Sequence, residues 1–512
     1  MSVAIKLFPD TYVDSVVQLR AMRAMREVDG VEWASAAMAT PANVEDLRTE
    51  GVEATQVAGS SSNDFFLVVR ATTDATAVEA LATGESAVTS SDPPGGTFDQ
   101  TEVPHSLRDA VRAQPASNVA VISLPGDYAA LAAYQALSTD LHVLLFSDNV
   151  PVAKEVALKD HALSRGRLLM GPGAGTAVLG GVGLGFANVV TPGPVGVVAA
   201  AGTGAQEAMA LLDRWGVGVS HVIGVGGRDL SAGVGGRMAC AAVSALREDA
   251  ATEVILLVSK PPAPDVVTRV LASAGGKPLV AALIGLDPQF PVPAGVLFAD
   301  TLETGVTATL GALGIAAPDT TATIGPTLAE VRSRLAPGRR LIRGLFSGGT
   351  LCYESLVILG RVIGEVHSNT PINKAWGLPA PADSHQCLDL GEEEFTRGRP
   401  HPMIDPEARL EVLAAHAADP SVAAIILDVV LGHGSDDDPA RTLAPACESA
   451  MADGGPQVVA YVLGTDQDPQ GYQSQRERLM RAGCIVTETA ARASLVAAAI
   501  ATGEPSLMRR SV

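Results

Sequence analysis

The sequence has few aromatic residues and lacks the composition of a disordered or fibrous chain. Aromatic residues make up 4% of its 512 positions, whereas hydrophobic residues make up 47% and glycine occurs 52 times. Parallel α/β sheets have this composition because helices bury both sheet faces, which are filled with small aliphatic side chains. The sequence therefore predicts an α/β protein, and its length is sufficient for about three or four domains.

Positive charge is also scarce. Lysine and arginine number 36 against 56 aspartate and glutamate residues, which gives a formal net charge of −20. Such a surface repels phosphate backbones and anionic lipids, so we expect neither nucleic acid nor a membrane as a partner. An anionic small-molecule substrate would need backbone N–H groups at its site to offset this repulsion.

Several metal and catalytic signatures are missing. The five cysteines are far apart, and no C-x-x-C pair or Cys/His cluster at zinc spacing occurs, so we expect reduced thiols and no metal site. The nucleotide motifs G-x-G-x-x-G and G-x-x-x-x-G-K-[ST] are absent, as are G-x-S-x-G and H-E-x-x-H. The first residues, MSVAIKLFPDTY, do not resemble a signal peptide, and no run of about 18 apolar residues occurs, so we expect a cytoplasmic protein.

Strand and helix patterns alternate along most of the chain. Residues 1–90 predict a small α/β domain, and residues 91–116, rich in Ser, Thr, Pro and Gly, predict a linker with one short helix. Three further βα units are expected at 117–190, 191–335 and 336–512, the last interrupted by an irregular stretch at 369–402. Strands alternating with helices imply parallel sheets, whose ligands lie beyond the carboxyl ends of the strands.

Two similar strand–turn–helix junctions are the clearest local signals. Both place glycine and a hydroxyl residue where a buried strand enters a helix, at Ala201-Gly202-Thr203-Gly204 and at Ser347-Gly348-Gly349-Thr350. The free N–H groups and the dipole of a helix N-terminus, worth about half a positive charge, bind phosphate or carboxylate groups. The alternative is a helix cap with a tight turn and no ligand.

A third glycine-rich stretch, Gly171–Phe186 (GPGAGTAVLGGVGLGF), is either a segment that lies along an extended ligand or a hairpin-like surface loop. Arg228 follows a strand and a glycine pair, where it could hold a phosphate or carboxylate bidentately or cap the next helix together with Asp229. His401 lies between prolines in TRGRPHPMID and is either a general acid or base or a structural histidine. The LGHGSDDDP segment (Leu431–Pro439) favours a solvated turn over a Mg²⁺ site.

The glycine motifs, taken in order, resemble the FdrA family. The resemblance covers nearly the whole chain and is carried by nine segments, among them LLMGPGAGTA, VVAAAGTGAQEA, IGVGGRDLSAGVGG, LFSGGTLCYES and LDLGEEEFTRGRPHPMID. That family is similar to succinyl-CoA synthetase subunits, which implies a CoA-binding-type Rossmann domain at 117–190 and flavodoxin-like ligase domains at 191–335 and 336–512. If CoA binds, the resemblance places its pyrophosphate against two glycine turns, formed by Pro125, Gly126, Gly171, Gly173, Gly175 and Thr176.

The synthetase resemblance implies acyl-CoA formation through an acyl phosphate and a phosphohistidine. This sequence departs from that plan, because no histidine occurs between His221 and His367 and the units above leave no room for an ATP-grasp module. FdrA-type proteins also resemble a subunit of a multi-protein oxamate carbamoyltransferase of allantoin breakdown, which converts oxalurate and phosphate to oxamate and carbamoyl phosphate. That reaction needs only anion sites and an orienting scaffold.

Our primary hypothesis from the sequence is carbamoyl transfer as one subunit of a complex. Gly202–Gly204 and Ser347–Thr350 would face one another and hold the substrates, while Arg228 stabilises the negatively charged tetrahedral intermediate. This hypothesis predicts that Thr203→Val or Arg228→Ala lowers turnover without preventing folding. The alternatives are an acyl-CoA synthetase that uses CoA and a non-catalytic assembly subunit that binds other protein chains.

Overall fold

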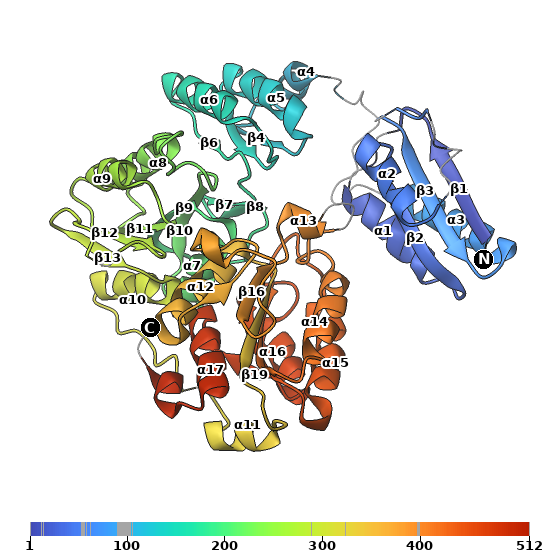
Figure 1. Cartoon of the computed structure of the whole chain (residues 1–512). Coiled ribbons are helices and arrows are strands. Elements are labelled where there is room, and N and C mark those ends of the chain that lie inside the picture. Colours follow the sequence, from blue (N-terminus) through green and yellow to red (C-terminus); the bar gives the residue numbers. More distant parts are fainter. Residues whose placement is uncertain are drawn as a thin grey trace. The chain divides into compact units, whose positions relative to one another are not determined.

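The structure is a computed structural model that describes residues 2–11, 13, 15–52, 57, 59–61, 63–89, 104, 106–287, 289–322, 324–396 and 400–510. The chain forms two compact units, one of Met1–Val103 with Arg397–Pro400 and one of Pro104–Thr396 with His401–Val512. Figure 1 shows both. Each unit is described by itself.

The first unit is a small α/β domain. Its elements are β1 (Ser2–Phe8), α1 (Ser15–Arg26), β2 (Val31–Met38), α2 (Pro41–Thr49), β3 (Phe65–Ala71) and α3 (Asp74–Thr89). The sheet is antiparallel with the order β1-β3-β2, and the central strand β3 is almost entirely buried. Alternate residues of β3 pack into separate clusters on the two sheet faces, as the period of two in a strand requires.

The second unit begins with α4 (Leu107–Ala113) and a three-stranded parallel sheet. The helix is capped by Ser106 and lies within the range predicted as a linker. The sheet has the order β4-β5-β6 and alternates with helices: β4 (Val119–Ile122), α5 (Gly126–Ser138), β5 (His142–Leu145), α6 (Val152–Ser164) and β6 (Leu169–Met170).

The glycine-rich segment after β6 forms a hairpin of β7 (Thr176–Leu179) and β8 (Val182–Gly185). Strand β7 pairs antiparallel with β10, so the hairpin is part of the following sheet. Hairpin geometry was one of the two alternatives for this stretch. The domain boundary predicted at residue 190 consequently divides a sheet, because residues on both sides of it pair with one another.

The first large domain (residues 176–312) contains a seven-stranded sheet of order β13-β12-β11-β9-β10-β7-β8, which includes the hairpin. Apart from the hairpin its strands are parallel. Its elements are β9 (Pro192–Ala200), α7 (Gly202–Arg214), β10 (Val219–Gly224), α8 (Arg237–Glu248), β11 (Val254–Ser259), α9 (Pro264–Ala272), β12 (Leu279–Leu283), β13 (Val296–Ala299) and α10 (Leu302–Ala312).

After α11 (Leu328–Arg334), the second large domain (residues 341–502) contains a six-stranded parallel sheet of order β15-β16-β14-β17-β18-β19. Its elements are β14 (Leu341–Phe346), α12 (Gly349–Ile363), β15 (Val366–His367), β16 (His385–Asp389), α13 (Glu393–Thr396), α14 (Leu410–Ala417), β17 (Val422–Val430), α15 (Pro439–Met451), β18 (Gln457–Leu463), α16 (Tyr472–Arg481), β19 (Ile485–Thr487) and α17 (Ala490–Thr502). The stretch predicted as irregular contains β16, which pairs with β14.

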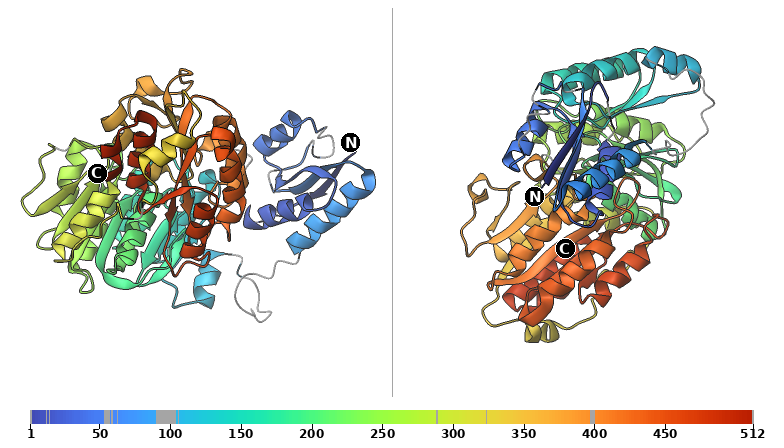
Figure 2. Two further views of the ribbon diagram at one scale, coloured as in Figure 1. Left: turned by 90° about the horizontal axis from the view of Figure 1, so that it is seen from below. Right: turned by 90° about the vertical axis from the view of Figure 1, so that its right-hand side faces the viewer.

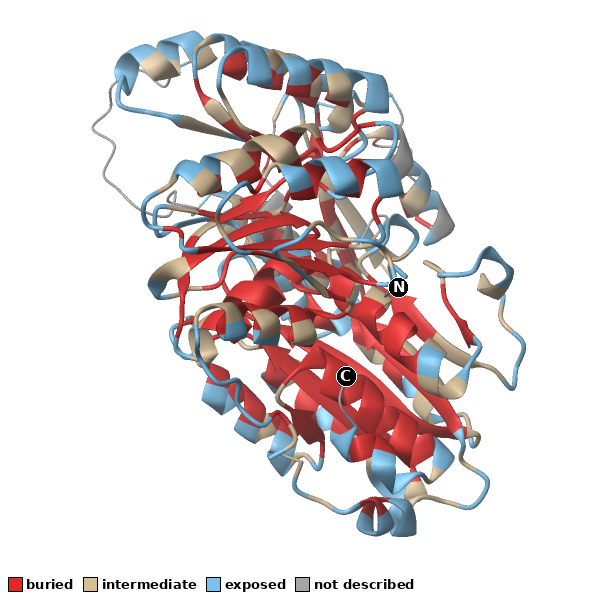
Figure 3. Cartoon of the chain, turned by 90° about the vertical axis from the view of Figure 1, so that its left-hand side faces the viewer, coloured by how far each residue is buried: buried red, intermediate tan, exposed pale blue. Residues whose placement is uncertain are grey.

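The two large domains have the same strand plan and share a core. In each, the first strand (β9 or β14) lies inside the sheet, enters a glycine turn and continues into a helix (α7 or α12). One hydrophobic cluster joins the inner sheet faces through α7, α10, α12 and α17, while the outer faces pack on their own helices. Figure 2 shows how these layers are arranged. Figure 3 shows buried strands between helices whose outer faces are exposed.

The predicted α/β fold with several parallel sheets and a small N-terminal domain is confirmed. Among helices in the described part of the chain, none combines the length and the apolar character that a membrane span requires.

Candidate functional site

The two predicted glycine turns meet. We call residues 201–204 the α7 turn and residues 347–350 the α12 turn. The backbone N–H of Thr350 donates to Thr203 Oγ1 over 3.2 Å, and both threonines are buried. A Cβ atom on Gly348 would lie 2.9 Å from Thr203 Cγ2, so glycine is needed for this close approach. The structure thus brings together the two motifs that the sequence singled out.

The α12 turn already holds a carboxylate of the chain. Asp428, on β17, accepts hydrogen bonds from the N–H groups of Ser347 and Gly348, each over 2.8 Å, and from Ser347 Oγ over 2.9 Å. Arg409 donates to the same carboxylate over 2.9 Å. Ser347 and Asp428 are each 1% exposed. These two amides are therefore not open to a substrate in this structure, which differs from the geometry that the sequence hypothesis assumed.

The α7 turn carries no such internal anion. Helix α7 has no side-chain cap, and the N–H groups of Gly202, Thr203 and Gly204 have no hydrogen-bond acceptor among the described residues. Gly202 is exposed, and a Cβ atom placed on it would meet nothing within 4 Å. Unpaired amides at a helix N-terminus favour an anion, so this turn meets the requirement for an anionic ligand.

Two charged side chains that the sequence analysis did not single out flank the junction of the two turns. Asp389 ends β16, and a Cβ atom on Gly349 would lie 2.3 Å from its Oδ2 atom and 3.5 Å from Lys260 Nζ. Lys260 directly follows β11. Both residues stand at the carboxyl ends of parallel strands, which is where ligands bind in such sheets. The only signal in the sequence was their position after apolar runs.

His401 lies next to this junction. A Cβ atom placed on Gly391 would lie 2.6 Å from His401 Nε2 and 3.2 Å from Asp389 Oδ1. Both side chains therefore border Gly391. Burial lowers the pKa of His401 to about 4. The N–H of Met403 donates to its Nδ1 atom, so the neutral ring carries its proton on Nε2. This geometry suits a hydrogen-bond donor better than a general base.

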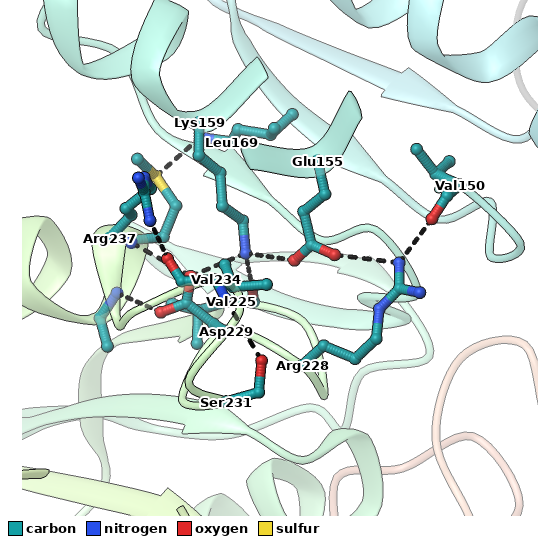
Figure 4. A network of polar contacts seen from close by, with 12 residues as sticks. Val150, Glu155, Lys159, Leu169, Val225, Arg228, Asp229, Ser231, Val234 and Arg237 are labelled. Carbon is teal, nitrogen blue, oxygen red and sulfur yellow. Dashed lines mark hydrogen bonds and ion pairs between the residues drawn. The ribbon is translucent and has the colours of Figure 1, made fainter. Parts of the chain in front are cut away.

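Arg228 lies in a different network, drawn in Figure 4. Its Nη2 atom contacts Glu155 Oε2 at 2.9 Å and donates to the carbonyl of Val150 over 2.7 Å. Glu155 also pairs with the buried Lys159, which contacts Asp229 at 2.7 Å. The described contacts of the Arg228 guanidinium group include neither glycine turn. The network joins α6 to the segment between β10 and α8, so its evident role is structural.

Two of the four glycines assigned to a CoA pyrophosphate are packed against backbone. A Cβ atom on Gly126 would lie 2.5 Å from the carbonyl oxygen of Asp148, and one on Gly171 would lie 2.3 Å from that of Leu145. The Thr176 hydroxyl donates to the carbonyl of Phe186. Pro125 precedes α5 without a side-chain cap, Gly173 is exposed, and Gly175 is half-buried. A ligand role for these six residues stays a prediction.

Two buried glutamates occupy matching places behind the turns. Glu207 on α7 accepts hydrogen bonds from the Tyr461 hydroxyl and from the N–H of Ala490, the first residue of α17. Glu354 on α12 accepts one over 2.6 Å from the N–H of Leu302, the first residue of α10. Burial raises the pKa of Glu207 to about 7 and raises that of Glu354 well above its ordinary value. Each large domain thus caps a helix of the other.

Three family models match the chain. A CoA-binding domain model matches residues 190–285, a CoA-ligase model matches residues 345–500, and a model described as AllF, heavy metal-associated domain, matches residues 1–104. The CoA-binding match lies outside 117–190, the range for which we predicted that domain. Fold and models together define an α/β protein that contains a CoA-binding and a CoA-ligase domain.

A full-length relative identifies the family more closely. The chain is 38% identical over 508 residues to the uncharacterized protein YahF of Escherichia coli, covering 97% of this chain and 98% of the relative. The chain therefore belongs to the YahF family. It is also 29% identical over 140 residues to the ADP-forming sulfoacetate-CoA ligase subunit SauD of Bilophila wadsworthia, covering 26% of this chain and 47% of that protein.

Succinate–CoA ligase subunits and solved structures are matched more distantly. The α subunit from Methanothermobacter thermautotrophicus is 28% identical over 113 residues, which cover 22% of this chain and 39% of that subunit. The apo form of the dinucleotide-forming acetyl-coenzyme A synthetase 1 of Ca. Korarchaeum cryptofilum aligns with 17% identity and a TM-score of 0.29, covering 76% of this chain and 84% of that one.

The N-terminal domain does not fit the metal chemistry in the name of its family model. Residues 1–104 contain neither cysteine nor histidine. In the described ranges no group of three or more His, Cys, Asp and Glu side chains is arranged to hold a metal ion. Soft transition metals favour thiolate, thioether and imidazole ligands, and this domain has no thiolate or imidazole donor.

Proposed function

We propose that this protein transfers an acyl group between CoA and phosphate, as the CoA-dependent part of a CoA ligase. The observation that carries the proposal is the junction of the α7 and α12 turns, which joins the CoA-binding match to the CoA-ligase match. The relatives named above that have an assigned activity are CoA ligases, and none of the proteins named there is described as a carbamoyltransferase.

The chemistry fits the groups at the junction. An acyl-CoA and phosphate would give an acyl phosphate and free CoA, with a carbon–oxygen bond formed and a carbon–sulfur bond broken. The free amides of the α7 turn would hold the phosphate, and His401 would donate a hydrogen bond through Nε2 to the oxyanion that develops on the acyl carbon. This half of a ligase reaction uses neither a nucleotide nor a phosphohistidine, which suits a chain without the expected histidine.

The acyl group in this proposal is a small anionic carboxylate. Sulfoacetate and succinate, named in the relatives' activities, are the first candidates. In this proposal, the network in Figure 4 holds residues 118–170 against residues 190–285, the range that matches the CoA-binding model. Other protein subunits would carry out any step that uses a nucleotide. We also propose that the chain is a member of the FdrA family.

The test is phosphate-dependent thiol release from succinyl-CoA and sulfoacetyl-CoA by the full chain. Gly202→Glu and Gly202→Gln form a matched pair, because the side chain at this open position adds a charge in one variant and not in the other. We expect release that requires phosphate and falls by about tenfold or more in Gly202→Glu relative to Gly202→Gln, since a fixed carboxylate competes for the amides.

Absence of thiol release with both thioesters would contradict the proposal. Oxalurate in place of the thioester provides the carbamoyl-transfer arm of the same assay. Carbamoyl phosphate formed only from oxalurate would restore the hypothesis drawn from the sequence.

A further inference from the structure

Lys260 is a cation without an ion pair. Among the described residues no carboxylate oxygen lies within 4.0 Å of its Nζ atom, although the chain carries 56 acidic residues. Its ammonium group lies 5.8 Å from the ring centre of Tyr353 and 3.5 Å from the Cβ position of Gly349. The residue as a whole is half-buried. A cation beside the N-terminus of α12, where Gly349 lies, is favourable only when an anion joins it.

Asp389 is a buried acid with one unused oxygen. The residue is 3% exposed, its Oδ1 atom accepts the N–H of Gly391 over 3.1 Å, and its Oδ2 atom has no hydrogen-bond donor among the described residues. The backbone of the residue is fixed on both sides by the side-chain amide of Asn369. Oδ2 points at Gly349, toward the Lys260 ammonium group.

The charged surroundings of Asp389 come from several elements. Lys260 follows β11, Glu392 lies in the next loop, Asp428 is on β17, and the neutral His401 lies beside Gly391. Burial raises the pKa of Asp389 to about 6, and the ammonium group of Lys260 acts in the opposite direction. An acid in this range exchanges protons near neutral pH.

The two side chains do not form a structural salt bridge. Arg409 and Asp428, close by, are within 2.9 Å of each other and bury both charges. Lys260 and Asp389 remain farther apart than 4.0 Å and each keeps an unused polar atom. The cation and the acid both border Gly349, and this pairing of charges suits an oxyanion that carries a proton.

We propose that Lys260 and Asp389 bind and deprotonate the phosphate in the reaction under "Proposed function", on which this assignment of roles rests. Lys260 holds one phosphate oxygen as the phosphate attacks the acyl carbon. The carboxylate of Asp389 accepts the proton that the attacking hydrogen phosphate loses, and returns it to the departing sulfur as the carbon–sulfur bond breaks. Atoms and charge balance without a further reactant.

The first experiment measures binding of inorganic phosphate by calorimetry to the full chain. Lys260→Met is compared with Lys154→Met, which removes an exposed lysine on α6, and with Lys260→Arg. We expect Lys260→Met to weaken phosphate binding by about tenfold or more, Lys260→Arg to retain part of it, and Lys154→Met to have no effect. An unchanged affinity in Lys260→Met, equal losses in both Met variants, or no binding by the wild type would overturn the role of Lys260.

The second experiment measures thiol release as a function of pH. The wild-type rate should rise with pH through about 6, as Asp389 becomes a carboxylate, and Asp389→Asn should lower kcat and remove this rise while the KM for phosphate changes little. A wild-type profile retained in Asp389→Asn would remove Asp389 from the proton transfer. If the wild type binds phosphate through Lys260 but releases no thiol, the anion site stands and the proposed reaction fails.

Discussion

The α7 turn and the α12 turn have the same sequence plan and opposite electrostatics. Asp428 is the residue of β17 next to Leu427, which pairs with Leu345, and Asp389 of β16 pairs with Phe346. The matching places in the first large domain are Val258 and Gly224, both paired with Ala199. The α12 turn is thus flanked by two acids and the α7 turn by none.

This difference shows that a glycine turn at a helix N-terminus is not in itself a ligand site. The positive end of α12 is neutralised by a carboxylate of its own sheet, whereas that of α7 is left for an anion from outside. Two domains with the same strand plan can in this way differ at their turns: the amides of one turn hold a carboxylate of the chain, and those of the other have no internal acceptor among the described residues. The predictions below test that difference.

The largest effect is expected for Asp428→Ala. The variant leaves two backbone amides buried without their acceptor and removes the carboxylate that pairs with Arg409. Among the described residues, the guanidinium group of Arg409 keeps only the carbonyl of residue 428. Removing one partner of a buried ion pair costs about 3–5 kcal/mol. Urea unfolding should show this loss for Asp428→Ala and a smaller loss of about 2 kcal/mol for Val258→Ala, its buried counterpart in the first domain. Equal losses would mean that Asp428 does not fix the α12 turn.

Glu207, the buried glutamate behind the α7 turn, should make stability depend on pH. Its pKa is raised by burial from 4.5 to about 7, with Arg214 and Tyr461 opposing the shift. Because the folded state holds the proton more tightly, its contribution is complete below about pH 4.5 and is lost as pH rises through about 7. The difference in unfolding free energy between wild type and Glu207→Gln should change by up to about 3 kcal/mol across this window. A constant difference would contradict the raised pKa.

The two equivalent glycines should respond differently to alanine. At Gly349 the new methyl group would lie 2.3 Å from Asp389 Oδ2, whereas at Gly202 it meets open space. We expect Gly349→Ala to lower the unfolding free energy by about 2 kcal/mol and Gly202→Ala to change it by less than about 0.5 kcal/mol. Thermal and urea unfolding of the pair would show whether the α7 turn is as open as the structure indicates.

The smallest effect is expected at the contact between the turns. Thr203→Val removes the acceptor for the N–H of Thr350 without changing the shape of the side chain. The cost should be about 1 kcal/mol, so the protein still folds. If the unfolding free energy of Thr203→Val equals that of the wild type, the hydrogen bond between the turns contributes nothing.

Long apolar runs that end in glycine or a polar residue predict buried strands, and two such runs, Leu341–Phe346 and Val422–Val430, are strands with these bounds. Strand β16 lies instead in the stretch predicted as irregular. The hairpin Thr176–Gly185 was assigned to the wrong side of a boundary, since its pairing with β10 is non-local.

The charged part of the site could not be predicted in the same way. Asp389 ends a short strand inside a stretch rich in proline and glycine, a composition that predicts a loop. Asp428 sits within an apolar run, and nothing local shows that its carboxylate reaches the turn of another strand. The neighbouring glycines of Arg228 suggest a ligand site, yet its ion-pair partner Glu155 lies 73 residues away on α6. Tertiary contacts decide these roles.

The most direct test of the account is a calorimetric titration of the full chain with CoA. A chain that matches a CoA-binding domain should bind one CoA per chain with micromolar affinity. Asp428→Asn, which keeps the α12 turn filled by a neutral amide, should bind CoA equally well. No binding at millimolar CoA would contradict the central claim that this chain works on CoA thioesters.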